Sequence, residues 1–278
     1  MRSRNFRQLL ESKWDDGKFL CIGLDTDLEK IPESARTGDV RSTLVAFNKA
    51  IIDATKDLVC SYKPNIAFYE AHGEQGIDAL RQTMAIITEL PDPIPVILDA
   101  KRGDILNTNE QYAIAAFEHL RADAITVNPY MGGEPLKPFF DRADKGVIVL
   151  CHTSNPGAGE VQDLTVDGEP LYKHIARITA EKWNSAGNCC VLVGATYPEE
   201  LREVRSVVGE MPILIAGVGA QNGDLQKTLE CGRDKNRRGL IVNASRSIIF
   251  ASEGPDFAEV ARQKATELHG AIKAAIVE

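Results

Sequence analysis

Short apolar segments alternate with amphipathic helical segments along the chain, and this alternation limits the folds that the chain can adopt. Eight short apolar runs are predicted to be strands: 19–24, 59–64, 96–99, 124–128, 146–151, 189–193, 213–216 and 240–243. Helical segments with apolar residues three or four positions apart lie between them: 41–58, 75–90, 107–120, 169–186 and 198–208. No Pro/Ser-rich linker divides the chain. We therefore expect an α/β protein with one domain over residues 1–278, folded as a closed (β/α)8, or TIM, barrel.

Composition excludes several classes of protein. With 44% hydrophobic and 26% charged residues, the 278-residue chain is typical of globular proteins. Its formal net charge of -8 argues against nucleic acid as the main partner. No apolar stretch approaches the roughly 18 residues of a membrane span, and the first ten residues lack the apolar core of a secretion signal, so a cytoplasmic location is expected. Six cysteines without CxxC spacing are expected to be buried free thiols.

A charge cluster follows the third predicted strand. Asp99, Lys101 and Asp104 place two carboxylates around one ammonium directly after a buried apolar run. In parallel α/β proteins, the carboxyl ends of the strands carry the chemistry. This cluster is therefore the leading candidate for a catalytic site.

The last two βα turns contain features that are typical of phosphate binding. Gly217 and Gly219 follow the seventh predicted strand, and Arg246 follows the eighth. Glycines let backbone N–H groups approach an anion, and an arginine can contact two phosphate oxygens at once. Asn222 stands where a dinucleotide-binding motif would need its third glycine, so that reading fails.

Six motifs occur in order at six expected barrel positions, and together they resemble the orotidine 5'-phosphate decarboxylase family, specifically its longer bacterial subfamily. The motifs are Gly23-Leu24-Asp25, Tyr62-Lys63-Pro64-Asn65, Asp99-x-Lys101-x-x-Asp104-Ile105, Ser154-Asn155-Pro156-Gly157, Gly217-Val218-Gly219-Ala220-Gln221 and Arg246. The resemblance covers essentially the whole chain. It implies decarboxylation of orotidine 5'-monophosphate to uridine 5'-monophosphate (UMP), the last step of pyrimidine nucleotide synthesis, without a cofactor or metal. The five histidines, of which His152 lies beside the expected pyrimidine loop, show no metal-ligand spacing.

The resemblance also implies roles for the charged residues. Lys101 would lie beside C6 of the pyrimidine and donate the proton that replaces the carboxylate, and Asp99 would lie close to that departing carboxylate. Lys63 and Asp104 would complete an alternating array of lysines and aspartates, in which each charge favours the ionised form of its neighbours.

Asp104, with Ile105 and Thr108, would serve the active site of the neighbouring subunit, so the resemblance implies a homodimer with shared sites. An alternative role for Asp104 is to cap the helix that is expected to begin near Leu106. The two roles are compatible.

The remaining motif residues would bind the rest of the substrate. Asp25 and Lys63 would contact the ribose hydroxyls, Ser154 the pyrimidine edge, and Gln221 and Arg246 the phosphate, beside Gly217 and Gly219. Two features depart from compact members of the family, namely Ser245 before Arg246, where they carry glycine, and a longer segment over 158–170. Neither that segment nor the loop 128–133 receives a role from the sequence.

Two alternative functions remain open. Hexulose-phosphate synthase is a related barrel that shares the DxKxxD motif but uses Mg²⁺, and its acidic metal ligand on strand two is replaced here by Lys63. A non-catalytic barrel that binds a nucleotide could retain Gly217, Gly219 and Arg246. It would have little reason to retain Lys101 between two carboxylates.

Overall fold

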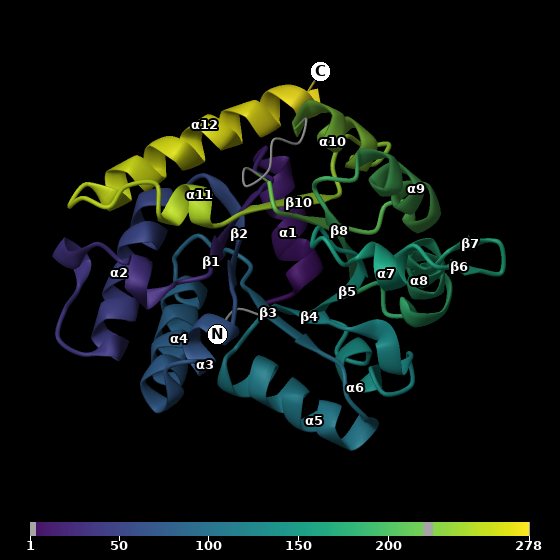
Figure 1. The fold of residues 1–278 in the computed structure, drawn as a ribbon, viewed down its shortest axis with the longest axis horizontal. Helices are drawn as coiled ribbons and strands as arrows, with labels where there is room; N and C mark the ends of the chain where they lie inside the picture. Colours follow the sequence, from purple (N-terminus) through teal and green to yellow (C-terminus); the bar gives the residue numbers. More distant parts are fainter. Residues whose placement is uncertain (1–3, 219–224, 278) are drawn as a thin grey trace.

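The computed structural model describes residues 4–218 and 225–277, and its central feature is a sheet of eight parallel strands (Figure 1). The strands lie side by side in the order β2-β1-β10-β9-β8-β5-β4-β3. Their bounds are Leu20–Leu24 (β1), Val59–Pro64 (β2), Ile97–Arg102 (β3), Ala124–Val127 (β4), Gly146–His152 (β5), Cys189–Gly194 (β8), Ile213–Ala216 (β9) and Leu240–Ala244 (β10). All eight predicted strands are confirmed.

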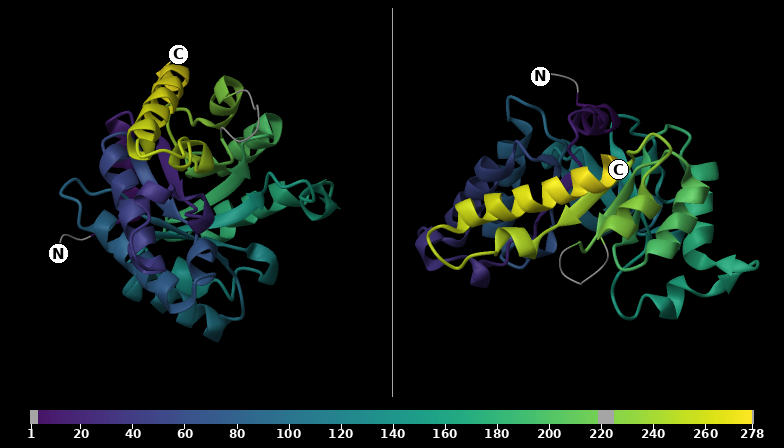
Figure 2. Two further views of the ribbon diagram at one scale, coloured as in Figure 1. Left: turned by 60° about the vertical axis from the view of Figure 1, so that its left-hand side comes forward. Right: turned by 90° about the horizontal axis from the view of Figure 1, so that it is seen from above.

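The two outer strands of this sheet, β2 and β3, meet and almost close it into a barrel (Figure 2). Parallel bridges join Tyr62 to Val96 and Asn65 to Asp99. The backbone N–H of Tyr62 donates to the carbonyl of Pro95 at 3.1 Å. The predicted (β/α)8 barrel is confirmed in this nearly closed form.

Helices surround the barrel and cover its amino-terminal end. The longer ones are α1 (Phe6–Asp15), α2 (Val40–Thr55), α4 (Gly73–Thr88), α5 (Leu106–Ile114), α8 (Leu171–Ile178), α9 (Pro198–Val208), α10 (Leu225–Gly232) and α12 (Phe257–Val277). Single-turn helices are α3 (Ala67–Glu70), α6 (Lys137–Phe140), α7 (Gly159–Gln162) and α11 (Arg246–Ile249).

The predicted helix over 169–186 is wrong at its start. Glu169 and Pro170 form strand β7, which pairs antiparallel with β6 (Thr165–Val166) in a hairpin that projects from the body of the molecule (Figure 1). The hairpin turn contains Asp167 and Gly168, both with positive φ. This turn chemistry interrupts the helical pattern, so α8 begins only at Leu171.

Helix α1 packs beneath the barrel. The Phe6 amide donates to the carbonyl of Asp144 just before β5, and the Trp14 indole N–H donates to the carbonyl of Leu240 at the start of β10. These contacts cover the amino-terminal ends of the strands. The opposite end, where the predicted site residues lie, remains available for a substrate.

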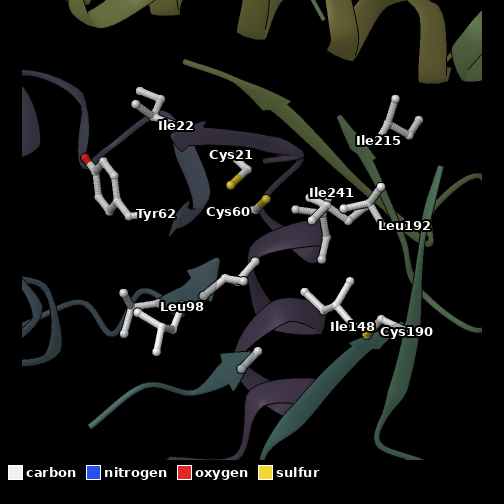
Figure 3. Close-up of a cluster of buried hydrophobic side chains, with 14 of the residues drawn as sticks. Cys21, Ile22, Cys60, Tyr62, Leu98, Ile148, Cys190, Leu192, Ile215 and Ile241 are labelled. Atoms are coloured by element: carbon white, nitrogen blue, oxygen red, sulfur yellow. The ribbon is translucent and has the colours of Figure 1, made fainter. Parts of the chain in front are cut away.

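The barrel strands are apolar on both faces because helices cover the outside and side chains fill the inside (Figure 3). All six cysteines are buried and free, as predicted. Within residues 4–218 and 225–277, no helix combines the length and the apolar character needed to cross a membrane.

Candidate active site

Strand β3 is irregular around Asp99 and Lys101. It was predicted to end at Asp99 but continues to Arg102, and its register with β4 shifts between Leu98 and Arg102. Lys101 has φ = 46°, in the left-handed region that non-glycine residues rarely adopt. A strained backbone conformation of this kind persists only where the surrounding structure holds it, and such residues cluster at functional sites.

Thr126 on β4 holds this irregular segment in place. Its Oγ1 accepts the backbone N–H groups of Ala100 at 3.0 Å and of Lys101 at 2.9 Å. The same hydroxyl donates to Oδ1 of Asp99 at 2.9 Å. One buried side chain therefore fixes both the backbone of Lys101 and the orientation of the Asp99 carboxylate.

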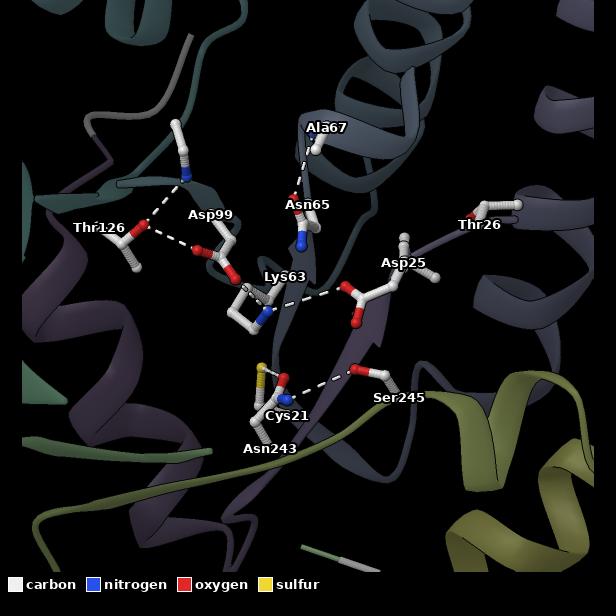
Figure 4. A network of polar contacts seen from close by, with 12 residues as sticks. Cys21, Asp25, Thr26, Lys63, Asn65, Ala67, Asp99, Thr126, Asn243 and Ser245 are labelled. Carbon is white, nitrogen blue, oxygen red and sulfur yellow. Dashed lines mark hydrogen bonds and ion pairs between the residues drawn. The ribbon is translucent and has the colours of Figure 1, made fainter. Parts of the chain in front are cut away.

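Four charged side chains from three neighbouring strand ends form the charge cluster, which we define as Asp25, Lys63, Asp99 and Lys101. Figure 4 shows the first three of them. Asp99 lies between two ammonium groups, with Oδ2 2.8 Å from Nζ of Lys63 and Oδ1 2.7 Å from Nζ of Lys101. Lys63 Nζ also lies 3.9 Å from Asp25 Oδ1. Asp99 and Lys63 are buried, whereas the Lys101 side chain is 47% exposed and faces solvent at the mouth of the barrel.

These contacts fix the charges of the buried pair. Burial alone would raise the pKa of Asp99, but the ammonium groups of Lys63 and Lys101 outweigh it and hold that pKa well below its usual range. Burial would lower the pKa of Lys63, but Asp99 and Asp25 outweigh it and raise the pKa above its usual value. The pair is therefore ionised at neutral pH.

Asp99→Asn should destabilise the protein by roughly 3 kcal/mol at neutral pH, because it leaves Lys63 buried beside an uncharged amide. The pKa of Asp99 is lowered on folding, so its contribution is complete above the unfolded value near 4 and declines as the pH falls below that value. Chemical denaturation between pH 2 and 7 measures the difference from wild type, which should shrink in acid.

The matched control is Asp53→Asn, because Asp53 also contacts two lysines, Lys49 and Lys56, but on the exposed face of α2. Exposed ion pairs of this kind contribute little, so the control should change the free energy of unfolding by less than about 1 kcal/mol. A difference for Asp99→Asn as small as for this control, or one that does not depend on pH, would contradict the assignment.

One carboxylate oxygen of Asp25, close to Lys63, has no hydrogen-bond donor in the part of the chain that the structure describes. Its Oδ1 is buried and has no hydrogen-bond partner within the described residues, although it lies within ion-pair distance of Lys63. A buried carboxylate oxygen without a donor is costly, so a ligand hydroxyl at this position would satisfy it.

Asp104 lies apart from the charge cluster within a single chain. It is exposed and makes no ion pair with any of the described residues. The alternative that it caps α5 is wrong, since the N-cap residue is Ile105, whose N–H the Asp104 carboxylate accepts at 2.7 Å. Asn109 holds the Asp104 backbone through two hydrogen bonds, at 3.0 and 2.7 Å. Thr108 lies half-buried in the first turn of α5.

Ser154 lies between the ends of β8 and β9. A Cβ atom at Gly194, the last residue of β8, would come within 2.9 Å of the Ser154 backbone nitrogen. A Cβ atom at Gly217 would lie 3.4 Å from its hydroxyl, and Gly217 has φ = 89°. Glycine at both positions lets the loop after β5 reach the predicted phosphate-binding turn.

After β10, Arg246 begins α11 with an exposed side chain that makes no hydrogen bond or ion pair to the rest of the described chain. Ser245, which precedes it, packs against β1, where a Cβ at Gly23 would lie 1.9 Å from its hydroxyl. The other two predicted phosphate contacts, Gly219 and Gln221, lie outside the described residues.

Comparison with known proteins adds an independent result. The sequence model of the "Orotidine 5'-phosphate decarboxylase / HUMPS family" matches residues 18–262. The chain belongs to this family. Curated decarboxylases of the same name from Cellvibrio japonicus and Janthinobacterium are 47% and 48% identical to it, over 98% and 96% of this chain and 99% and 97% of their own.

Solved structures of the decarboxylase family share the fold over the whole chain. The Leishmania donovani OMP decarboxylase has a TM-score of 0.86 at 35% identity and covers 99% of both chains. The L. donovani UMP synthase has a TM-score of 0.87 at 37% identity, and the match covers 98% of this chain and 57% of that longer one.

Thr126 is the residue that the sequence reasoning missed. The signal available was weak, since a single threonine in the apolar run Ala124-Ile125-Thr126-Val127 is an ordinary strand residue. Its importance depends on the neighbouring strand, because only the pairing of β3 with β4 places its hydroxyl beside Asp99.

Proposed function

We propose that this member of the decarboxylase family is a carboxy-lyase that converts orotidine 5'-monophosphate to UMP and CO2 without a cofactor, as the last step of de novo UMP synthesis. The observation that supports this most is the ammonium of Lys101, held 2.7 Å from a buried carboxylate at the barrel mouth of a chain about half identical to named decarboxylases. The hexulose-phosphate synthase alternative is disfavoured by Lys63, which offers no oxygen ligand to Mg²⁺.

The proposed chemistry needs a cation and a proton at one carbon. The bond between C6 and the carboxylate carbon breaks, CO2 leaves, and the electron pair stays on C6. The Lys101 ammonium stabilises this developing carbanion and then donates a proton to it, which forms the C6–H bond of UMP. Solvent reprotonates Lys101, whose side chain is 47% exposed.

The surrounding charges prepare this step. We assign the substrate carboxylate a position beside Asp99, so that loss of neutral CO2 relieves a like-charge contact. Lys63 and Lys101 hold the pKa of Asp99 well below its usual range and so keep it ionised, and the Asp99 carboxylate in turn holds the Lys101 ammonium at 2.7 Å. Asp104 of the neighbouring subunit completes the array.

We assign residues to the ribose, the pyrimidine edge and the phosphate of the substrate by their position and chemistry. Asp25, with its unsatisfied buried oxygen, and Lys63 bind the ribose hydroxyls. Ser154 hydrogen-bonds the pyrimidine edge. The phosphate is bound by Gly217 and Arg246, together with Gly219 and Gln221. Binding of this distant phosphate helps to exclude water from the reacting carbon.

We propose that the chain forms a homodimer across the loops that follow β3 and β4. These loops touch, since the Asn128 amide donates to the Arg102 carbonyl at 2.7 Å. They also carry four large apolar side chains that are 37–88% exposed: Ile105, Leu106, Tyr130 and Met131. Burial of such a patch in a two-fold interface would place Asp104, Ile105 and Thr108 at the partner's site.

We propose that residues 1–278 form a single domain, because α1 and α12, at the two ends of the described chain, both pack on barrel strands. Arg262 of α12 binds Asp57, just after α2, through two hydrogen bonds of 2.7 and 2.8 Å.

A charged nucleotide does not cross membranes unaided, and a biosynthetic enzyme acts where its substrate is made. We therefore propose a cytoplasmic location, with neither nucleic acid nor membrane as a partner.

The proposal is tested by adding orotidine 5'-monophosphate to metal-stripped protein with chelator present and following the loss of orotate absorbance. We expect rapid loss, with UMP as the product. A requirement for Mg²⁺ would favour the hexulose-phosphate synthase alternative. Tight UMP binding by folded, dimeric protein without any turnover would favour a non-catalytic nucleotide-binding barrel.

A further inference from the structure

The segment 158–170, to which the sequence gives no role, returns to the end of β5 and is attached there by two adjacent residues. Gln162, the last residue of α7, contacts Thr153, and the next residue, Asp163, contacts His152. Thr153 and His152 directly precede Ser154. The segment therefore holds the loop that carries the proposed pyrimidine contact.

Gln162 binds Thr153 through both ends of its amide. Its Oε1 accepts the Thr153 backbone N–H at 2.8 Å, and its Nε2 donates to the Thr153 hydroxyl at 2.8 Å. Two hydrogen bonds with defined directions fix the orientation of the peptide next to Ser154 more firmly than apolar contact would.

Asp163 contacts a histidine that is buried and confined between two tyrosines. The His152 ring is 1% exposed and lies edge-on to Tyr172 and Tyr197, with ring centroids 4.8 and 4.4 Å away. Tyr172 is itself fixed, since its hydroxyl donates to Glu203 at 2.9 Å. A confined imidazole at the end of β5 is a suitable anchor for the exposed Asp163 carboxylate, whose Oδ1 lies 3.0 Å from its Nε2.

The surroundings of His152 also determine where its proton lies. Its Nδ1 is buried and has no hydrogen-bond partner within residues 4–218 and 225–277. A buried N–H without an acceptor is more costly than a buried lone pair, so the geometry favours the tautomer that carries its proton on Nε2 and donates it to Asp163. The contact therefore requires an acceptor at position 163 but not a negative charge.

We propose that Asp163 and Gln162 are positioning residues that hold Ser154 for recognition of the pyrimidine ring, an inference that rests on the proposed function. Among the described residues, neither side chain has a hydrogen bond or ion pair with a residue that we assign to the substrate. Ser154 is confined on its other side by Gly194 and Gly217, so release of the α7 attachment frees the loop in one direction only. Arg246, at the phosphate end, belongs to a different element, α11, and Gly217 confines Ser154 on the side that the α7 attachment does not reach, so we expect phosphate binding to persist.

The test compares three variants, Asp163→Ala, Asp163→Asn and Gln162→Ala, with the control Glu160→Ala. Glu160 lies on the same helix, and its carboxylate makes no hydrogen bond within the described chain. Affinity is measured by calorimetry for UMP and for ribose 5-phosphate, which lacks the pyrimidine. We expect Asp163→Ala and Gln162→Ala each to weaken UMP binding about fivefold, the size of one lost hydrogen bond, and to leave ribose 5-phosphate unchanged. Asp163→Asn should restore UMP affinity.

A second measurement needs no ligand. Hydrogen exchange at the Thr153 amide, which donates to Gln162, should accelerate in Asp163→Ala and Gln162→Ala but not in Glu160→Ala. Equal effects on UMP and ribose 5-phosphate, no effect on UMP, or unaltered exchange would overturn the inference. Absence of decarboxylation by wild type would instead overturn the proposed function. The two failures can be told apart, because hydrogen exchange is measured without turnover.

Discussion

Lys101→Ala is expected to lower the rate of decarboxylation at saturating substrate by roughly four orders of magnitude, since it removes the proposed proton donor, which is also the proposed cation beside the developing carbanion. The proposed ribose and phosphate contacts involve other residues, among them Asp25 and Arg246. Affinity for UMP should therefore persist, so that the loss is seen in kcat and far less in binding. Single-turnover absorbance measurements and UMP titration give the two quantities.

The matched control for this variant is Lys56→Ala. The Lys56 side chain is 46% exposed and pairs with Asp53 at 3.0 Å, close to the 47% exposure and 2.7 Å pairing of Lys101. The two substitutions thus remove similar side chains, and only one of them lies at the barrel mouth. Near-normal turnover by Lys101→Ala, or an equal loss in both variants, would contradict the role of Lys101.

The sequence was sufficient to predict the barrel and most of the charge cluster. Eight buried parallel strands leave short apolar runs that differ clearly from the amphipathic helices between them. Because parallel strands end on the same side, residues far apart such as Asp25, Lys63 and Asp99 could be placed at one mouth without knowledge of any distance.

The local backbone of the site could not be predicted. The positive φ of Lys101 arises from the register shift between β3 and β4, and Thr126 supports it from the neighbouring strand. A periodic pattern carries no information about such a shift, because it depends on how two strands pair. The attachment of Asp163 to His152 was inaccessible for the same reason, since both ends depend on tertiary packing.

Asp104 connects the site to the proposed dimer. Within one chain it is exposed, lacks an ion-pair partner among the described residues, and is held by Asn109 through its backbone only. Two observations therefore point to an interface at this position. The Asp104 carboxylate is exposed, and the exposed apolar side chains of Ile105 and Leu106 lie beside it. A residue that serves its own site would be expected to contact Lys101.

A mixture of two inactive variants should therefore regain activity. If Asp104 acts across the interface, a hybrid of Lys101→Ala with Asp104→Ala has one site in which both residues are lost and one in which both are intact. Random pairing of equal amounts makes about half of the dimers hybrids, so roughly a quarter of wild-type activity should return. If Asp104 instead acted within its own chain, each site of the hybrid would carry one defect. Activity measured after subunit exchange, with hybrids confirmed by mass spectrometry of tagged chains, separates the two arrangements, because hybrids without activity would place Asp104 in its own subunit's site or outside the reaction.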